Sequence, residues 1–110
     1  MESIGSEELH QLLRQSDVQL VDVRTPEEVS FGYIAGAKHI DFYHTDFMDR
    51  ITQLDKKKPV VVYCAVGGRS AQASRKLSDA GFEKVYDLAG GFRQWQSEGF
   101  PTEQSSNVGN

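Results

Sequence analysis

The single cysteine of the sequence, Cys64, stands at the junction of a predicted strand and a predicted helix. Before it, Val60–Tyr63 is a run of β-branched and aromatic residues, which favours a strand buried on both faces. From Ser70 onward the pattern becomes helical, with Ala73 and Leu77 on one face. A helix start presents unpaired N–H groups and the positive end of the helix dipole, and both favour an anion. We therefore expect Cys64 to be a thiolate at neutral pH and to act as a nucleophile.

A lone cysteine at a strand end is most often only a small buried side chain. The residues after Cys64 argue for a catalytic role, because Gly67 and Gly68 can take backbone conformations that are closed to other residues. Successive N–H groups that point inward would form a concave anion site around the sulfur, although the glycines could also serve only the turn. The amides that we expect to face the sulfur belong to Ala65, Val66, Gly67, Gly68, Arg69 and Ser70.

Two roles are open for Arg69, the residue at the end of this loop. Its guanidinium fork could hold an anionic substrate, or it could pair with Asp22 or another carboxylate and fix the loop from behind. Ser70 is expected to cap the helix that follows, and its hydroxyl could also approach the sulfur. Asp22 and Arg24 lie at the end of a second predicted strand. Because ligand sites of doubly covered parallel sheets gather at the carboxyl ends of the strands, both could border the pocket.

Predicted helices and strands alternate along the chain. The predicted helices are Glu7–Gln15 with Ser6 as its cap, a short helix from Pro26, Thr45–Leu54, a helix from Ser70 to Ala80, and a last helix after Gly90. The predicted strands are Leu20–Val23, Ala37–Ile40, Val60–Tyr63 and Val85–Leu88. Thr25 and Glu28 match a capping box that has proline at the first helical position. This order implies an α/β sandwich with a mainly parallel sheet, as a single domain over 1–103 with a flexible tail over 104–110.

Length, charge and cysteine count exclude several classes of protein. The sequence has 110 residues and a formal net charge of −4, which fits one domain and argues against a nucleic-acid partner. No apolar run approaches the ~20 residues that cross a bilayer, and the start MESIGSEELH lacks the features of a signal peptide. One cysteine excludes an intrachain disulfide, so we expect a cytoplasmic protein unless an export signal has been removed. The histidines lack metal-ligand spacing, so no metal and no cofactor is expected.

The loop and four other stretches together resemble the rhodanese family. A strand ending in Tyr-Cys, four further residues, and then Arg69 and Ser70 is similar to the active-site loop of that family. The other stretches are VDVRTPEE, GYIAGAKHI, GFEKVYDLAGGFRQW and GFPTE, in that order. The resemblance covers residues 4–103 and implies a three-layer sandwich, with a mainly parallel central sheet of about five strands and helices on both faces. It also favours a structural role for the Asp22 and Arg24 pair over a chemical one.

The resemblance implies sulfur transfer through a persulfide on Cys64. The donor would be thiosulfate or a persulfide or polysulfide, and the acceptor cyanide, glutathione or a protein thiol. With no second cysteine in the chain, the acceptor must come from outside. Ala65 and Val66 occupy places where relatives often carry Arg or Lys, so we expect weaker capture of doubly charged thiosulfate and a preference for persulfide or polysulfide donors.

Two alternatives to a sulfurtransferase remain open. Phosphatase or arsenate reductase chemistry also uses a cysteine cradle closed by arginine, but its loop is one residue longer than the four residues between Cys64 and Arg69. A shorter loop should suit a sulfur atom better than a tetrahedral phosphate. The other alternative is a non-enzymatic interaction module or a partner-dependent sulfur carrier. We expect a monomer that binds neither nucleic acid nor membrane.

Overall fold

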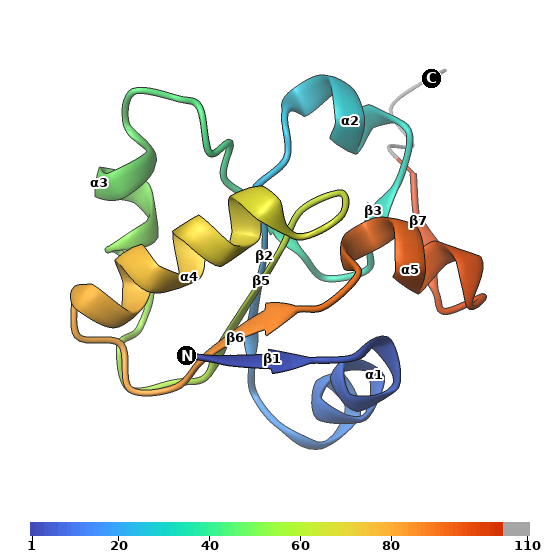
Figure 1. The fold of residues 1–110 in the computed structure, drawn as a ribbon, viewed down its shortest axis with the longest axis horizontal. Helices are drawn as coiled ribbons and strands as arrows, with labels where there is room; N and C mark the ends of the chain where they lie inside the picture. The colour runs from blue at the N-terminus through green and yellow to red at the C-terminus, as the bar shows by residue number, and fades with distance from the viewer. Residues whose placement is uncertain (105–110) are drawn as a thin grey trace.

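The computed structural model describes residues 1–104 and has a central sheet of five parallel strands (Figure 1). The strand order is β1-β6-β5-β2-β4. These strands are β1 (Glu2–Ile4), β6 (Val85–Leu88), β5 (Val60–Tyr63), β2 (Gln19–Asp22) and β4 (Lys38–His39). The central strand is thus the one that leads to Cys64. The expected α/β fold with a mainly parallel sheet is confirmed.

Helices cover both faces of this sheet (Figure 1). One face packs against α3 (Phe47–Ile51) and α4 (Gly68–Asp79), and the other against α1 (Ser6–Gln15) and α5 (Gly91–Ser97). Along β5 the side chains alternate between the two cores, because successive residues of a strand point to opposite faces. Cys64 continues this alternation and therefore lies on the α4 face.

A capping box starts α2 (Pro26–Ser30), as the sequence predicts. The Thr25 side chain accepts a hydrogen bond from the Glu28 N–H, and the Glu28 carboxylate accepts one from the Thr25 N–H at 3.0 Å. Two donors at the helix start are thereby satisfied. This reciprocal contact also fixes the position of Glu28, which contributes to the site described below.

The predictions differ from the structure at several element ends. The helix after the Cys64 loop begins at Gly68 rather than Ser70, and Ser6 is the first residue of α1, whose N-cap is Gly5. The hydroxyl of Ser6 is buried and finds no hydrogen-bond partner within the described residues, so it does not cap the helix. The helix predicted over Thr45–Leu54 is shorter and spans Phe47–Ile51.

Three short strands were not predicted. β1 pairs along β6, and β3 (Tyr33–Ile34) pairs antiparallel with β7 (Thr102–Glu103) in a separate two-stranded sheet. Segments of two or three residues are too short to show a period, so pairing with a distant partner determines their conformation.

The sequence predicts a flexible C-terminal tail and no segment that crosses a membrane. Apart from Gln104, the predicted flexible tail over 104–110 lies outside the described residues. Within the described part of the chain, none of the helices has the length and apolar character needed to cross a bilayer.

The start of α5 approaches the Cys64 loop closely. Gly91 has a φ of +59°, and a Cβ atom there would lie 2.5 Å from the Cys64 carbonyl oxygen and 2.6 Å from that of Ala65. Only glycine fits this contact, because real Cβ atoms do not approach carbonyl oxygens so closely.

We predict that Gly91→Ala destabilises the protein more than Gly99→Ala. Both glycines have positive φ, but at Gly99 (φ +81°) a Cβ meets nothing within 4 Å. Gly99→Ala should therefore cost only the backbone strain, about 1–2 kcal/mol, whereas Gly91→Ala should cost about 1–3 kcal/mol more from the steric conflict. Urea unfolding of the two variants measures the difference. Equal losses in the free energy of unfolding would contradict the importance of the contact.

Candidate active site

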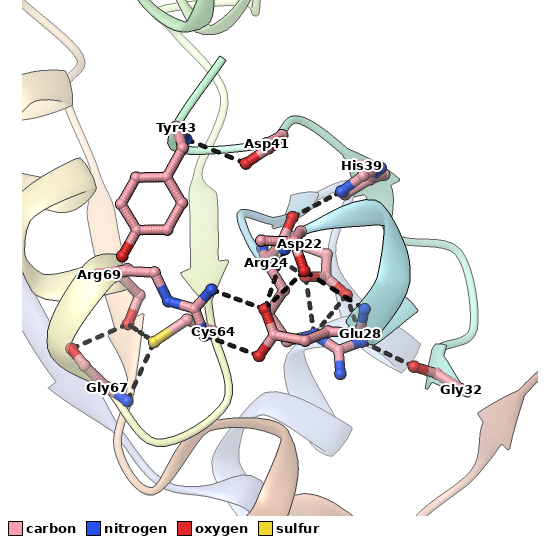
Figure 2. Close-up of polar contacts among 12 residues, drawn as sticks. Asp22, Arg24, Glu28, Gly32, His39, Asp41, Tyr43, Cys64, Gly67 and Arg69 are labelled. Atoms are coloured by element: carbon pink, nitrogen blue, oxygen red, sulfur yellow. Dashed lines mark hydrogen bonds and ion pairs between the residues drawn. The ribbon is translucent and has the colours of Figure 1, made fainter. Parts of the chain in front are cut away.

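The sulfur of Cys64 is buried and receives a main-chain hydrogen bond. The Gly67 N–H donates to Sγ at 3.0 Å (Figure 2). The Ser70 Oγ lies 3.6 Å from Sγ. The residue is 1% exposed and borders the apolar core of the α4 face. An apolar wall thus surrounds the inner side of the sulfur, while the loop directs polar groups at it.

The loop is fixed by two hydrogen bonds from α5. The Phe92 N–H donates to the Cys64 carbonyl at 2.8 Å, and the Arg93 N–H donates to the Ala65 carbonyl at 3.1 Å. A trans peptide unit points its carbonyl and the following N–H in opposite directions. With the Ala65 carbonyl bound to α5, the N–H of Val66 is turned away from α5.

These polar contacts determine the ionisation of Cys64. Burial raises the pKa of the thiol, but hydrogen bonds from the Ser70 side chain and from the main chain of Ser70, Gly67 and Val66 lower it further than burial raises it. The net pKa lies below the ordinary thiol value, which is the direction expected for a thiolate held by amide groups.

The structure distinguishes among the loop residues whose amides we expected to face the sulfur. Within residues 1–104, Gly67 alone makes a main-chain hydrogen bond to Sγ of ordinary length, and its φ of +133° requires glycine. Gly67 is the N-cap of α4, with Gly68 as the first helical residue, so Ser70 lies inside the first turn and is not the cap. Ala65 and Val66 form the loop, and the Val66 side chain is 57% exposed.

Arg69 pairs with Glu28 of α2 and not with Asp22. Its two terminal nitrogens donate to the two carboxylate oxygens at 2.7 and 2.9 Å (Figure 2). The hydrogen bond from Arg69 is the main cause that lowers the pKa of Glu28, to about 2, so the ion pair persists over the whole neutral range. Of the two roles left open by the sequence, the contact to a carboxylate is the one observed.

Ser70 connects Cys64 to a buried carboxyl group that the sequence did not reveal. Its Oγ lies 2.5 Å from Oδ1 of Asp87, at the end of β6, and 3.2 Å from the Gly67 carbonyl. Burial raises the pKa of Asp87, although the hydrogen bond from Ser70 and the charge of Arg75 oppose this. The expected approach of the Ser70 hydroxyl to the sulfur is observed, with Asp87 as an additional partner.

Asp22 and Arg24 form a buried ion pair next to the site. The Arg24 guanidinium donates to Asp22 at 2.7 to 3.1 Å and to the Gly32 carbonyl at 2.7 Å, and it lies 4.3 Å from the centre of the Phe92 ring. These contacts tie the end of β2 to the loop after α2 and to α5. The structural role that the family resemblance implies for this pair stays a prediction.

Sequence reasoning missed two residues of the site, Glu28 and Asp87. Glu28 was recognised only for the capping box, and its pairing with Arg69 joins residues that are 41 positions apart. Asp87 shares a strand face with Val85, which is buried against α4. A carboxyl on an apolar strand face was the available signal, because buried carboxyl groups need a hydrogen-bond partner.

Comparison with known proteins identifies the family. A family model described as "Rhodanese-like domain" matches residues 6–98. "Thiosulfate sulfurtransferase GlpE" of Pseudomonas aeruginosa is 38% identical over 103 residues, which cover 94% of this chain and 90% of the relative. A "Sulfurtransferase" of Allochromatium vinosum is also 38% identical and covers 89% of this chain and 91% of its own length.

Solved structures agree with this assignment. A rhodanese-related protein from Thermoplasma volcanium superimposes with a TM-score of 0.85 at 31% identity, covering 96% of this chain and 100% of that one. A polysulfide-sulfur transferase homodimer from Wolinella succinogenes superimposes with a TM-score of 0.81 at 30% identity, covering 100% of this chain and 83% of that one. The chain therefore belongs to the rhodanese-like family, as a sulfurtransferase of that family.

Proposed function

We propose that the protein transfers a sulfane sulfur through a persulfide on Cys64, from a small anionic donor to an external acceptor. The observation that carries this proposal is the Gly67 N–H directed at the Cys64 sulfur, at 3.0 Å, in a loop that lowers the pKa of the thiol. The names of the relatives support two classes of donor, thiosulfate and polysulfide. Cyanide, glutathione or a protein thiol would be the acceptor.

The first half-reaction forms the persulfide. The Cys64 thiolate attacks the outer sulfur of the donor, a new S–S bond forms, and the S–S bond of the donor breaks. The electron pair of the broken bond leaves on sulfite, if thiosulfate is the donor, or on a thiolate or shorter polysulfide. The amides around the sulfur stabilise negative charge before and after this step.

The second half-reaction returns the enzyme to its resting form. An acceptor nucleophile attacks the outer sulfur of the Cys64 persulfide, and the Cys64 thiolate leaves with the electron pair of the S–S bond. Since Cys64 is the single cysteine, no internal thiol can take the sulfur. A hollow of about 350 Å³ adjoins Ala65, lined also by Phe31 and Arg93, and its size is in the range of small-molecule sites. We assign this hollow to the acceptor.

The ion pair of Arg69 supports a preference for persulfide or polysulfide donors over thiosulfate. Arg69 is the one formal cation of the Cys64–Ser70 loop, and Glu28 neutralises it through two hydrogen bonds. A dianion therefore meets less positive potential than a free guanidinium would supply. The reactive group of a persulfide carries a single negative charge and depends less on this cation.

Two other functions are less well supported. A carrier that passes sulfur only to a partner protein would use the same half-reaction, and slow turnover of free acceptors would favour it. Phosphatase chemistry would need room for a tetrahedral phosphate and a free arginine, whereas Arg69 is bound to Glu28. An aryl-phosphate assay distinguishes a phosphatase from a sulfurtransferase. Phosphatase activity that is lost in Cys64→Ser would favour the phosphatase over the sulfurtransferase. A monomeric state and a cytoplasmic location stay predictions.

Intact mass spectrometry tests the persulfide directly. After incubation with glutathione persulfide or thiosulfate and removal of the donor, the wild-type protein should gain the mass of one sulfur atom. The gain should be absent in Cys64→Ala and should disappear when cyanide or glutathione is added. An unchanged mass with both donors would contradict the proposed half-reaction.

We predict that Glu28→Gln raises turnover with thiosulfate. The glutamine can still accept the Thr25 N–H and keep the capping box, but it no longer neutralises Arg69. The specificity constant kcat/KM for thiosulfate should rise by about 3- to 10-fold. The kcat/KM for glutathione persulfide should change much less. Glu27→Gln, on the exposed side of the same helix turn, is the matched control. A fall with thiosulfate, or equal changes with both donors, would show that Glu28 does not set the donor preference.

A further inference from the structure

Three buried side chains form a continuous hydrogen-bonded row at the carboxyl ends of two neighbouring strands. Cys64 follows β5, Asp87 belongs to β6, and Ser70 of α4 lies between them. Sγ of Cys64 lies 3.6 Å from Oγ of Ser70, which in turn lies 2.5 Å from Oδ1 of Asp87. The exposed fractions are 1% for Cys64, 0% for Ser70 and 7% for Asp87. The outer part of this row, Asp87, takes no part in the sulfur transfer described so far.

The number of protons in this row limits its arrangements. A serine hydroxyl has one proton to donate, and a carboxylate can only accept. When Asp87 is ionised, the Ser70 hydroxyl donates to it, and the Cys64 thiol donates its S–H to the Ser70 oxygen. When Asp87 is protonated, it donates to Ser70, and the Ser70 hydroxyl is free to donate to a Cys64 thiolate. Both arrangements satisfy every group, and they differ only in the position of one proton.

We propose that Asp87 takes the proton of the Cys64 thiol through the Ser70 hydroxyl. The thiol passes its proton to the Ser70 oxygen as the Ser70 hydroxyl proton moves to Oδ1 of Asp87. The S–H, Ser70 O–H and carboxylate become a thiolate, a Ser70 O–H and a carboxylic acid, with no net change in charge or in the number of protons. Ser70 stays neutral throughout. Asp87 accepts the proton without touching the sulfur, and because it acts on Cys64 only through Ser70 it is a positioning residue.

The surroundings of Cys64 and of Asp87 both favour the transfer of the proton between them. Burial raises the pKa of Asp87, and hydrogen bonds lower the pKa of Cys64, so the two groups compete for one proton more evenly than in water. The distance of 2.5 Å is typical of a strong hydrogen bond between a hydroxyl and a carboxylate. The Gly67 carbonyl, at 3.2 Å, is the weaker alternative acceptor for the Ser70 hydroxyl.

The surrounding elements supply few other charges to the row. Opposite Asp87, β5 places Val62 and β1 places Ser3, and neither is ionisable. From α4, the charge of Arg75 favours the ionised form of Asp87. On the other side of the sulfur, Arg69 faces Cys64 and is itself paired with Glu28. The phenol of Tyr43 lies next to Arg69.

The relay rests on the proposed role of Cys64 and adds a proton route to it. The first half-reaction needs a thiolate, and an internal acceptor supplies one without releasing a proton to water from a buried site. After the acceptor has taken the sulfur, the proton on Asp87 can return to the Cys64 thiolate by the same path. Resting enzyme would then hold one proton that is shared between sulfur and carboxyl.

The test is the pH dependence of thiolate formation, measured by the rate of alkylation with iodoacetamide from about pH 4 to about pH 10. Two coupled groups that share a proton titrate in two steps. Wild-type protein should therefore show a plateau of intermediate rate between the steps. In Asp87→Asn the plateau should vanish, and the rate below the single pKa should fall about tenfold per pH unit. Cys64→Ser supplies the blank.

Two further variants locate the path. Ser70→Ala should also give a single step, at a higher pKa than in Asp87→Asn, because the sulfur loses a hydrogen-bond donor. Asp79→Asn, at the exposed end of α4, should keep both steps. A single step in the wild-type protein overturns the relay, even if no variant folds, and so does a plateau that survives in Ser70→Ala. Alkylation requires no sulfur donor, so a missing persulfide and a missing plateau would refute different proposals.

Discussion

The orientation of two peptide units underlies the electrostatics of the site. α5 binds the carbonyls of Cys64 and Ala65 through the N–H groups of Phe92 and Arg93. Because the peptides of residues 1–104 are trans, an N–H that follows such a carbonyl points the other way. The N–H groups of Ala65 and Val66, which follow these two carbonyls, are thus turned away from α5, a helix that packs on the opposite face of the sheet from the sulfur. Gly91 makes this approach possible, since any side chain there would collide with both carbonyls.

A buried ion pair holds this helix in place. Arg24 lies over the Phe92 ring and binds Asp22 and the Gly32 carbonyl, so β2, the loop after α2 and α5 meet at one guanidinium. Burying two charges is costly, and the hydrogen bonds from Arg24 to both carboxylate oxygens of Asp22 and to the Gly32 carbonyl offset part of that cost. Through Phe92, whose N–H binds the Cys64 carbonyl, Asp22 and Arg24 are linked to the loop without contacting the sulfur.

The sequence reveals those parts of the site that depend on neighbouring residues. The strand before Cys64, the glycines of its loop and the capping box of Thr25 and Glu28 are all local patterns, and each is found in the structure. The pairs that complete the site join residues 41 and 17 positions apart, Arg69 with Glu28 and Ser70 with Asp87. Local spacing carries no information on such pairs, because the order of the strands in the sheet brings them together.

The predicted start of the helix after the Cys64 loop was wrong for a related reason. A helix start after a glycine loop is set by the residue that satisfies the first N–H groups, and the sequence offered Ser70 as the obvious cap. The structure instead uses the Ser70 hydroxyl for Asp87 and Cys64, and the helix begins two residues earlier, at Gly68. Moving the start of the helix places Ser70 in its first turn with the hydroxyl directed at the sheet. A polar group that is withdrawn from its usual structural task is therefore a sign of function here.

Charge in the site is carried by dipoles more than by ions. The guanidinium groups of Arg24 and Arg69 are each bound to a carboxylate, and the groups that face the sulfur are the Gly67 N–H and the Ser70 hydroxyl. Dipoles fixed by the fold do not need to reorganise when the anion changes. Thiolate and persulfide both carry one negative charge, and the persulfide only moves that charge outward by one S–S bond. The fixed Gly67 N–H and the Ser70 hydroxyl are therefore suited to hold a sulfur anion through the whole cycle, because the amount of charge that they stabilise remains the same.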